Sequence, residues 1–148
     1  MIPIKVHHDS HQRPYRHPFG AVECGQLVQL AFRLSPPEGM RPRIQAWLRL
    51  WLDNQREVLL PMSPLDRGED DLWYAIDYQA PDQAGPVWYY FLIEVEGQAY
   101  YYCNNAGQLG GLGHLDTRPG YSYQLTVHEP GRVPAWYKEG LVYQIYVD

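Results

Sequence analysis

The feature that most constrains this chain is a hydrophobic alternation with a period of two residues, which recurs along most of its length. The segment Gln26–Leu34 is typical, because Val28, Leu30 and Phe32 fall on one side and Gln29 on the other. Successive side chains of a β-strand point to opposite faces, so this pattern predicts strands with one buried face. Runs of the same kind cover 43–52, 58–62, 72–78, 87–95, 98–103 and 121–127.

Turn-forming stretches rich in proline and glycine separate these runs, at 35–39, 63–68 and 80–86. No stretch shows a helical stripe with capping residues. A length of 148 residues suits one domain with a real hydrophobic core. Short strands that alternate with turn signals predict an all-β fold, an immunoglobulin-like antiparallel β-sandwich. We expect this sandwich to occupy residues 1–128.

The C-terminal residues depart from this pattern. A linker punctuated by proline is predicted over 129–140, and the run 141–148 is apolar on both of its faces. A strand of that kind is typical of a parallel sheet covered on both sides. No neighbouring strand follows, so we expect 141–148 to be the start of a further unit that this sequence does not complete.

Charge and hydropathy exclude several classes of partner. The formal net charge is −5 and the basic residues do not cluster, which argues against nucleic acid. The longest apolar run, Val87–Ile93, is far shorter than the roughly 20 residues of a membrane helix. The first residues lack the apolar core of a signal peptide, so we predict a cytoplasmic protein, with an upstream export signal left open. Cys24 and Cys103 are expected to be free thiols.

The C-terminal residues also carry a family resemblance. They resemble the junction in glycoside hydrolase family 13 at which an N-terminal sandwich leads into the first strand of the catalytic barrel. Pro134 and Trp136 match the P-x-W of that junction, 141–145 match the barrel strand, and Asp148 matches the aspartate that opens D-R-F. Tyr146-Val147 stands where Phe-Pro is commoner.

Softer matches touch most of the remaining chain. Residues 100–105, 110–113 and 123–127 look like the end of the N-terminal domain in bacterial amylases, pullulanases and neopullulanases. Residues 8–9 and 15–22 look like its beginning.

The resemblance implies an accessory domain of an enzyme that acts on starch, pullulan or maltodextrins, with 141–148 as strand 1 of a (β/α)₈ barrel. The catalytic carboxylates of such enzymes lie on later barrel strands, so we expect no catalytic residue and no activity in this chain. Its expected role is to position an α-glucan, to pack on its own barrel, or both. The alternative is a purely structural or dimerisation domain, which would place a homodimer partner on it. The resemblance implies no cofactor here, although calcium is possible in the parent enzyme.

Aromatic residues are the candidates for sugar binding. The chain has 13 Tyr and 5 Trp against 3 Phe, and the flat faces of Tyr and Trp can stack on sugar rings. Trp47 and Trp51 share one side of their strand, Trp88 lies opposite the core side of 87–95, and Tyr101 precedes a glycine-rich loop. We name these four as candidate carbohydrate-binding residues. The alternatives are a docking face for the barrel or a partner subunit, and ordinary burial.

Two groups of residues raise the question of a metal site. The first is acidic and consists of Asp66, Glu69, Asp70 and Asp71. It lacks the ligand spacing of an EF-hand, so a solvated loop is expected. The second consists of His7, His8, His11 and His17. No helix sets two of them on one face, so we expect a flexible arm and no metal.

Overall fold

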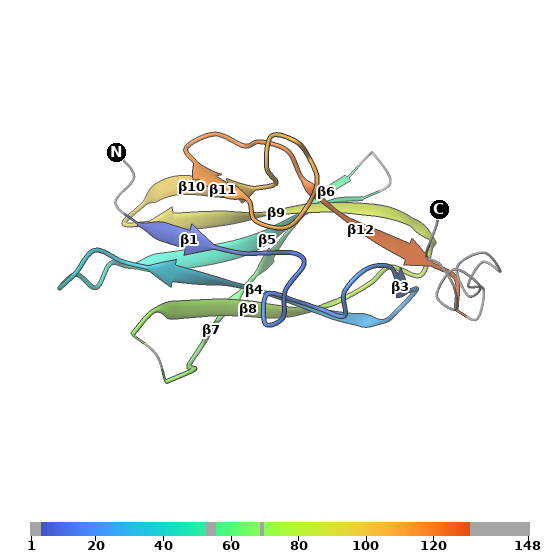
Figure 1. The fold of residues 1–148 in the computed structure, drawn as a ribbon, viewed down its shortest axis with the longest axis horizontal. Helices are drawn as coiled ribbons and strands as arrows, with labels where there is room; N and C mark the ends of the chain where they lie inside the picture. The colour runs from blue at the N-terminus through green and yellow to red at the C-terminus, as the bar shows by residue number, and fades with distance from the viewer. Residues whose placement is uncertain (1–3, 53–55, 69, 131–148) are drawn as a thin grey trace, which may run out of the picture.

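The computed structural model describes residues 4–52, 56–68 and 70–130, and none of them forms a helix (Figure 1). The strands are β1 (Lys5–His7), β2 (Arg16–His17), β3 (Val22–Glu23), β4 (Leu27–Ser35), β5 (Ile44–Leu52), β6 (Arg56–Pro61), β7 (Ser63–Leu65), β8 (Leu72–Gln79), β9 (Gly85–Val95), β10 (Gln98–Cys103), β11 (His114–Asp116) and β12 (Tyr123–His128). Every strand that the alternation predicted is present, as β4, β5, β6, β8, β9, β10 and β12.

The strands form two sheets that face each other as layers (Figure 1). In the smaller, five-stranded sheet the order is β1-β4-β8-β7, and β2 also pairs with β4. In the larger, seven-stranded sheet the order is β11-β10-β9-β12-β3. Strand β5 also pairs with β9, and β6 pairs with β5. All pairings are antiparallel except that of β12 with β3. The all-β sandwich is thus confirmed, while the immunoglobulin-like subtype stays a prediction.

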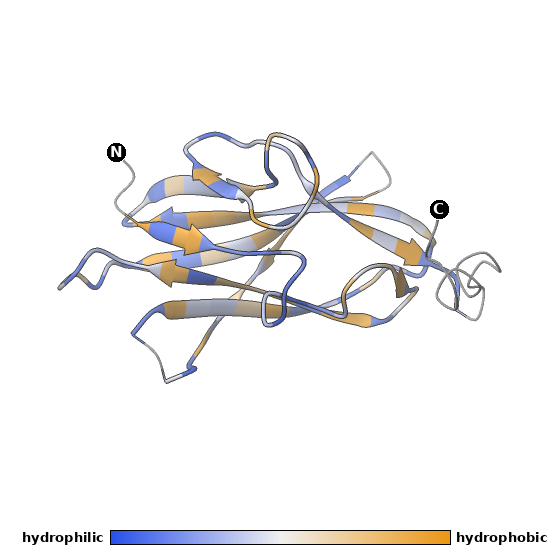
Figure 2. Cartoon of the chain, viewed as in Figure 1, coloured by the Kyte–Doolittle hydropathy of each residue, from blue (hydrophilic) through white to orange (hydrophobic). Residues whose placement is uncertain are grey.

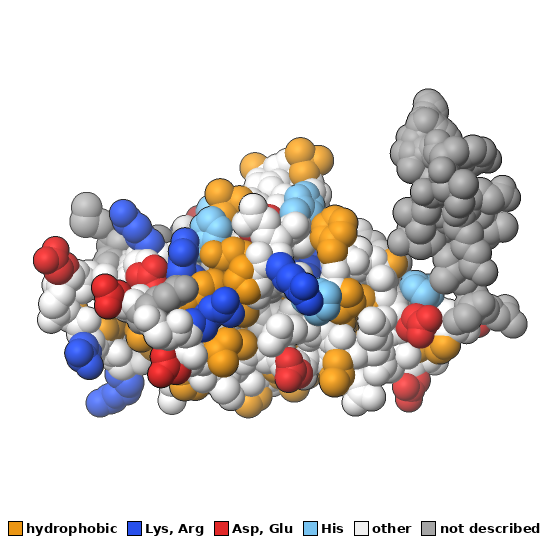
Figure 3. Space-filling view, turned by 60° about the horizontal axis from the view of Figure 1, so that its bottom comes forward, with side chains coloured by type: hydrophobic (Ala, Val, Ile, Leu, Met, Phe, Trp, Pro, Cys, Tyr) orange, Lys and Arg blue, Asp and Glu red, His pale blue; other side chains and the backbone are white. Residues whose placement is uncertain are grey.

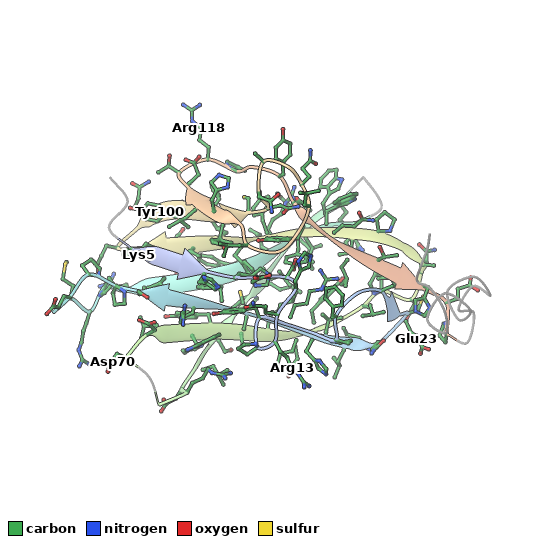
Figure 4. All side chains as sticks on the ribbon, viewed as in Figure 1. Lys5, Arg13, Glu23, Asp70, Tyr100 and Arg118 are labelled. Atoms are coloured by element: carbon green, nitrogen blue, oxygen red, sulfur yellow. The ribbon has the colours of Figure 1, made fainter. Side chains whose placement is uncertain are left out.

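The core lies between the two sheets and follows directly from the alternation. Hydrophobic and hydrophilic residues alternate along the long strands (Figure 2). Phe32 of β4 contacts Phe91 of β9 with ring centroids 5.3 Å apart, and Leu48 and Leu50 of β5 are fully or almost fully buried. Each such side chain contributes about 1.5–3 kcal/mol when removed from water. Figure 4 shows side chains of both sheets filling this space, whereas Arg118 projects from a loop away from the sheets.

The N-terminal segment is packed against the sandwich, and the expectation of a flexible histidine arm is wrong. His8 is fully buried. Its Nδ1 lies 2.8 Å from the carbonyl oxygen of Ala31, and its Nε2 lies 3.1 Å from the hydroxyl of Tyr89. The Ser10 N–H then donates to the carbonyl of Gly111 at 3.1 Å. A buried histidine whose two nitrogens are satisfied is stable in the core, but its partners come from distant strands that local spacing does not reveal.

The family junction falls outside the described residues. Pro134, Trp136 and 141–148 all lie there, as does most of the predicted linker. The boundaries 1–128, 129–140 and 141–148 therefore stay predictions. Within the described ranges, no helix is long and apolar enough to cross a membrane.

Candidate functional site

The outer face of the larger sheet carries all four aromatic residues that the sequence predicted for sugar binding. Trp51 of β5 lies directly opposite Trp88 of β9. Trp47 lies opposite Leu92 of β9, which in turn lies opposite Tyr101 of β10. Residues paired across neighbouring strands point to the same face, and each of the four aromatic side chains is half-buried. The strand order therefore brings three distant segments onto one surface.

Trp51 and Trp88 share a hollow, which we call the outer groove. The groove has a volume of about 490 Å³. It is lined by Arg49, Trp51, Trp88, Tyr90, Gln108, Pro119, Gly120 and Ser122. Its volume falls within the range of about 300–1,000 Å³ that is usual for ligand sites. Its floor is the strand pair β5–β9, and its side is formed by the two loops that flank β11, with Gln108 before that strand and Pro119, Gly120 and Ser122 after it.

Arg49 fixes the centre of the outer groove. Its guanidinium carbon lies 4.6 Å from the ring centroid of Tyr90 and 5.5 Å from that of Trp51. Its Nε donates to a carboxylate oxygen of Glu57 at 2.7 Å, and its Nη1 donates to Ser122 Oγ at 3.5 Å. The positive charge is thus compensated by Glu57 and spread over two aromatic faces. Such a site suits a neutral ligand better than an anion.

The other two predicted residues lie beside the groove. The ring of Tyr101 meets that of Tyr90 edge to face, with centroids 6.0 Å apart. Tyr90 is itself buried, and this burial raises the pKa of its hydroxyl. Trp47 lies on the same face but lines a separate hollow of about 230 Å³ with Pro61. The structure therefore unites Trp51 and Trp88 and separates Trp47 from them.

The loop that walls the groove is anchored to tyrosines on the inner face of the sheet. The hydroxyl of Tyr102 donates to the His8 carbonyl at 2.9 Å and accepts the Gly113 N–H at 3.0 Å. The hydroxyl of Tyr123 donates to the Gly111 carbonyl at 3.0 Å. A side chain at Gly113 would overlap the Cys103 carbonyl and the Tyr123 hydroxyl. Only glycine therefore fits at this position, and the loop is tied to β10 and β12.

Asparagines complete the loop, which the sequence marked only by its glycines. Asn104 Oδ1 accepts the N–H groups of Asn105 and Gly110, at 2.8 and 3.2 Å. Asn105 Nδ2 donates to the Gly110 carbonyl at 2.7 Å, and Gly110 has a φ of 76° that favours glycine. These bonds place Gln108 at the groove. Sequence reasoning missed Gln108, Pro119 and Gly120, because no local pattern indicates which sheet face such a loop will cover.

The residues considered for a metal site do not gather at the outer groove. Among the described residues, no group of three or more His, Cys, Asp and Glu lies close enough to hold a metal ion. Glu69 of the acidic group lies outside them, and Asp71 is bound to Arg33 and Ser35. Cys103 is a buried thiol whose sulfur accepts the Gly120 N–H at 3.2 Å, and burial raises its pKa.

The face on the side of the smaller sheet differs from the groove. Positive and negative side chains are interspersed there with hydrophobic ones (Figure 3). Trp73 of β8 is buried and stacks on Tyr15 of the N-terminal segment, with ring centroids 5.3 Å apart. Its indole is therefore part of the packing and offers no platform to a ligand.

Comparisons with known proteins give two kinds of match, although no family model matches the chain. The chain is 30% identical over 146 residues to the amylopullulanase of Thermoanaerobacterium thermosulfurigenes, covering 95% of the chain and 8% of that protein. It is also 30% identical to the amylopullulanase of Thermoanaerobacterium saccharolyticum, of which it covers 11%. The chain thus spans about a tenth of the length of these relatives, and its sequence resemblance to starch-acting enzymes is confirmed.

A solved structure supports the fold. A cyclomaltodextrinase superposes on 91% of the chain with a TM-score of 0.56, and the chain covers 22% of that protein. The sequence identity is 16%, so this match concerns the fold alone. The same sandwich therefore occurs as one part of a larger protein.

Proposed function

We propose that this chain, which is homologous to a segment of the amylopullulanases, is an N-terminal accessory domain of a family 13 glycoside hydrolase and binds its α-glucan substrate in the outer groove. Catalysis would belong to another part of the parent enzyme, while this domain holds and orients the glucan. Remote contacts of this kind raise the rate by positioning the substrate. The observation that carries the proposal is the placement of Trp51 and Trp88 side by side in one open hollow.

The chemistry of the groove suits a sugar in two respects. The half-buried indole rings of Trp51 and Trp88 expose apolar surface on which the C–H face of a glucose ring can stack. Gln108 and Ser122 supply polar groups at the edge, where sugar hydroxyls can donate and accept hydrogen bonds. Because Glu57 compensates Arg49, the groove presents no free charge that would select an ionic ligand.

A titration of the chain with maltoheptaose, followed by NMR of the tryptophan indole N–H signals, tests the proposal. We expect saturable shifts for Trp51 and Trp88 and none for Trp73, which is buried under Tyr15. Trp51→Ala and Trp88→Ala should each weaken binding by about tenfold or more, which corresponds to ~1.4 kcal/mol. Trp47→Ala is the matched control, since it removes the same ring from the same face outside the groove. Unshifted indole signals at millimolar sugar would refute the proposal.

A structural or dimerisation role is the second candidate, and one observation favours it. Apolar surface continues from the groove onto β6, where Leu59 lies opposite Arg49 and is 48% exposed. A barrel of the parent enzyme or a second copy of the chain would cover such a face. Sedimentation equilibrium tests the dimer. A dimer that dissociates in Trp51→Ala and Leu59→Ser would favour the second candidate, whereas a monomer at every concentration would rule out dimerisation and leave docking on the parent barrel as the structural role.

A further inference from the structure

We propose that a glucan bound in the outer groove continues past Trp88 into a second hollow, so that Trp88 forms the ridge between two subsites of one bent binding track. We call the second hollow the inner bowl. It has a volume of about 380 Å³, and its lining includes Arg16, Phe19, Trp88, Leu109, Gln124 and Thr126. This inference rests on the proposed function of the outer groove and adds the path and the length of the ligand.

The two hollows adjoin, because Trp88, Gln108 and Ser122 line both of them. Trp88 lies opposite Trp51 on one side and opposite Gln124 of β12 on the other. Neighbouring strands lie about 4.8 Å apart, so this row of three positions crosses about 10 Å of the sheet. A chain of linked sugars is extended enough to follow such a row, whereas a single sugar ring would occupy only one of the hollows.

The rim of the inner bowl carries two large apolar side chains that the fold leaves in water. Phe19 is 65% exposed and Leu109 is 79% exposed, and they belong to segments far apart in the sequence. The ring of His11 contacts Phe19 edge to face at 5.6 Å, and the Leu109 N–H donates to Asn105 Oδ1 at 3.1 Å. Single exposed apolar residues are ordinary, but two that line one hollow offer a ligand a larger apolar contact.

The floor of the inner bowl is polar. Arg16 is 7% exposed, and its two terminal nitrogens donate to the carbonyl oxygens of Gln124 and Gly20 at 3.2 and 3.1 Å. Its Nε is buried without a hydrogen-bond partner, and the guanidinium shapes the floor of the bowl. The side-chain amide of Gln124 donates to Thr126 Oγ1 at 3.4 Å and keeps its oxygen free for a hydroxyl. A polyhydroxyl chain matches these groups, because each hydroxyl both donates and accepts.

The two-subsite track predicts that affinity depends on the length of the glucan. Maltotriose should settle mainly in the outer groove, where the tryptophans provide the larger apolar contact. Maltoheptaose should reach across Trp88 and also contact Phe19 and Leu109. We therefore expect maltoheptaose to bind about tenfold more tightly than maltotriose.

Calorimetric titration of both sugars into four variants tests the inference. The double variant Phe19→Ser with Leu109→Ser should lose most of the preference for maltoheptaose and should bind maltotriose within about twofold of the original chain. Trp51→Ala should weaken both sugars. Leu27→Ser is the control, since Leu27 is 60% exposed on β4 and lines neither hollow. Leu109→Ala alone, which truncates the more exposed side chain, is measured as the variant least able to disturb folding.

The outcomes separate the inference from the function on which it rests. If the original chain binds both sugars and the double variant still prefers maltoheptaose as strongly, the proposed track is wrong, while binding in the outer groove stays supported. An equal loss for both sugars in the double variant would also overturn it, because the bowl would then be the primary site. If the original chain binds neither sugar at millimolar concentration, both the proposed function and the proposed track are refuted.

Discussion

The two faces of β9 use the same kinds of side chain for opposite purposes. On the inner face, Tyr89 is fully buried, hydrogen-bonded to His8 and stacked on Tyr123 with ring centroids 5.2 Å apart. On the outer face, Trp88 and Tyr90 line a hollow that is open to solvent. The inner aromatic residues have their polar atoms satisfied by the protein, whereas the outer aromatic residues line a hollow that reaches solvent. The neighbouring positions 88, 89 and 90 therefore alternate between the outer groove and the core.

The two faces also differ in how they carry charge, because the inner face is buried and the outer face is open to solvent. Burial lowers the pKa of His8 to about 3 and raises that of Tyr89 to about 12, so both are neutral in the folded chain. On the outer face, Glu57 and two aromatic rings compensate the charge of Arg49. The inner face should therefore respond strongly to proton uptake and to lost hydrogen bonds, and the outer face only weakly. The predictions below test this contrast.

The largest effect should come from acid acting on His8. The Ala31 carbonyl can only accept, so Nδ1 carries the proton and Nε2 accepts the Tyr89 hydroxyl. The unfolded chain takes up a proton near pH 6.5 but the folded chain only near pH 3, so this stability is full above 6.5 and is lost as pH falls towards 3. The loss is about 1.4 kcal/mol per pH unit. The unfolding free energy, measured with urea at several pH values in this window, should depend on pH more steeply by that amount in the original chain than in His8→Asn. An equal pH dependence in the two chains would contradict the assignment.

The second effect concerns the anchor of the loop. Gly113→Ala should destabilise the chain by about 3 kcal/mol, because the added carbon meets the Cys103 backbone and the Tyr123 hydroxyl. Gly107→Ala in the same loop is the control, since its nearest neighbour would be a Leu109 side-chain carbon at 3.4 Å. Thermal unfolding measures both. Equal stability of the two variants would show that the loop can move away from the sheet.

The third test compares neighbours on β10 that point to opposite faces. Tyr102→Phe leaves the His8 carbonyl and the Gly113 N–H without their partner and should cost about 2 kcal/mol. Tyr101→Phe removes the same hydroxyl from the outer face, where water replaces it, and should cost less than about 0.5 kcal/mol. Chemical denaturation of both variants at neutral pH is the measurement. A reversed order would mean that the buried hydroxyl contributes nothing to the anchoring of the loop.

The smallest effect is expected at Glu57. Its side chain is 52% exposed, so Glu57→Gln should change the unfolding free energy by no more than about 0.5 kcal/mol. The same substitution frees the charge of Arg49 and should make sugar binding more dependent on salt, without abolishing it. Titration with maltoheptaose at low and high ionic strength checks this. A loss of several kcal/mol in stability would show that the outer face, too, depends on a satisfied polar network.

Much of the fold could be read from local patterns, and the site only in part. The alternation in Gln26–Leu34 correctly indicated β4 and its buried side, and Trp51 and Trp88 were correctly placed on the side away from the core. The loop that walls the groove was visible only as a glycine-rich stretch. Phe19 and Leu109 gave no signal, because an exposed apolar residue in a loop becomes meaningful only beside a hollow that other segments form.

The sequence by itself determined which side of each long strand enters the core, because the period of two is a local property of the backbone. It also determined the resemblance to starch-acting enzymes. Only the tertiary structure decided that Trp51 meets Trp88 while Trp47 stands apart, and that His8 lies inside the sandwich. Strand order and loop anchors depend on contacts between residues far apart in the chain, as between His8 and Tyr89. No local pattern encodes such a contact, because its energy exists only once both sheets have packed.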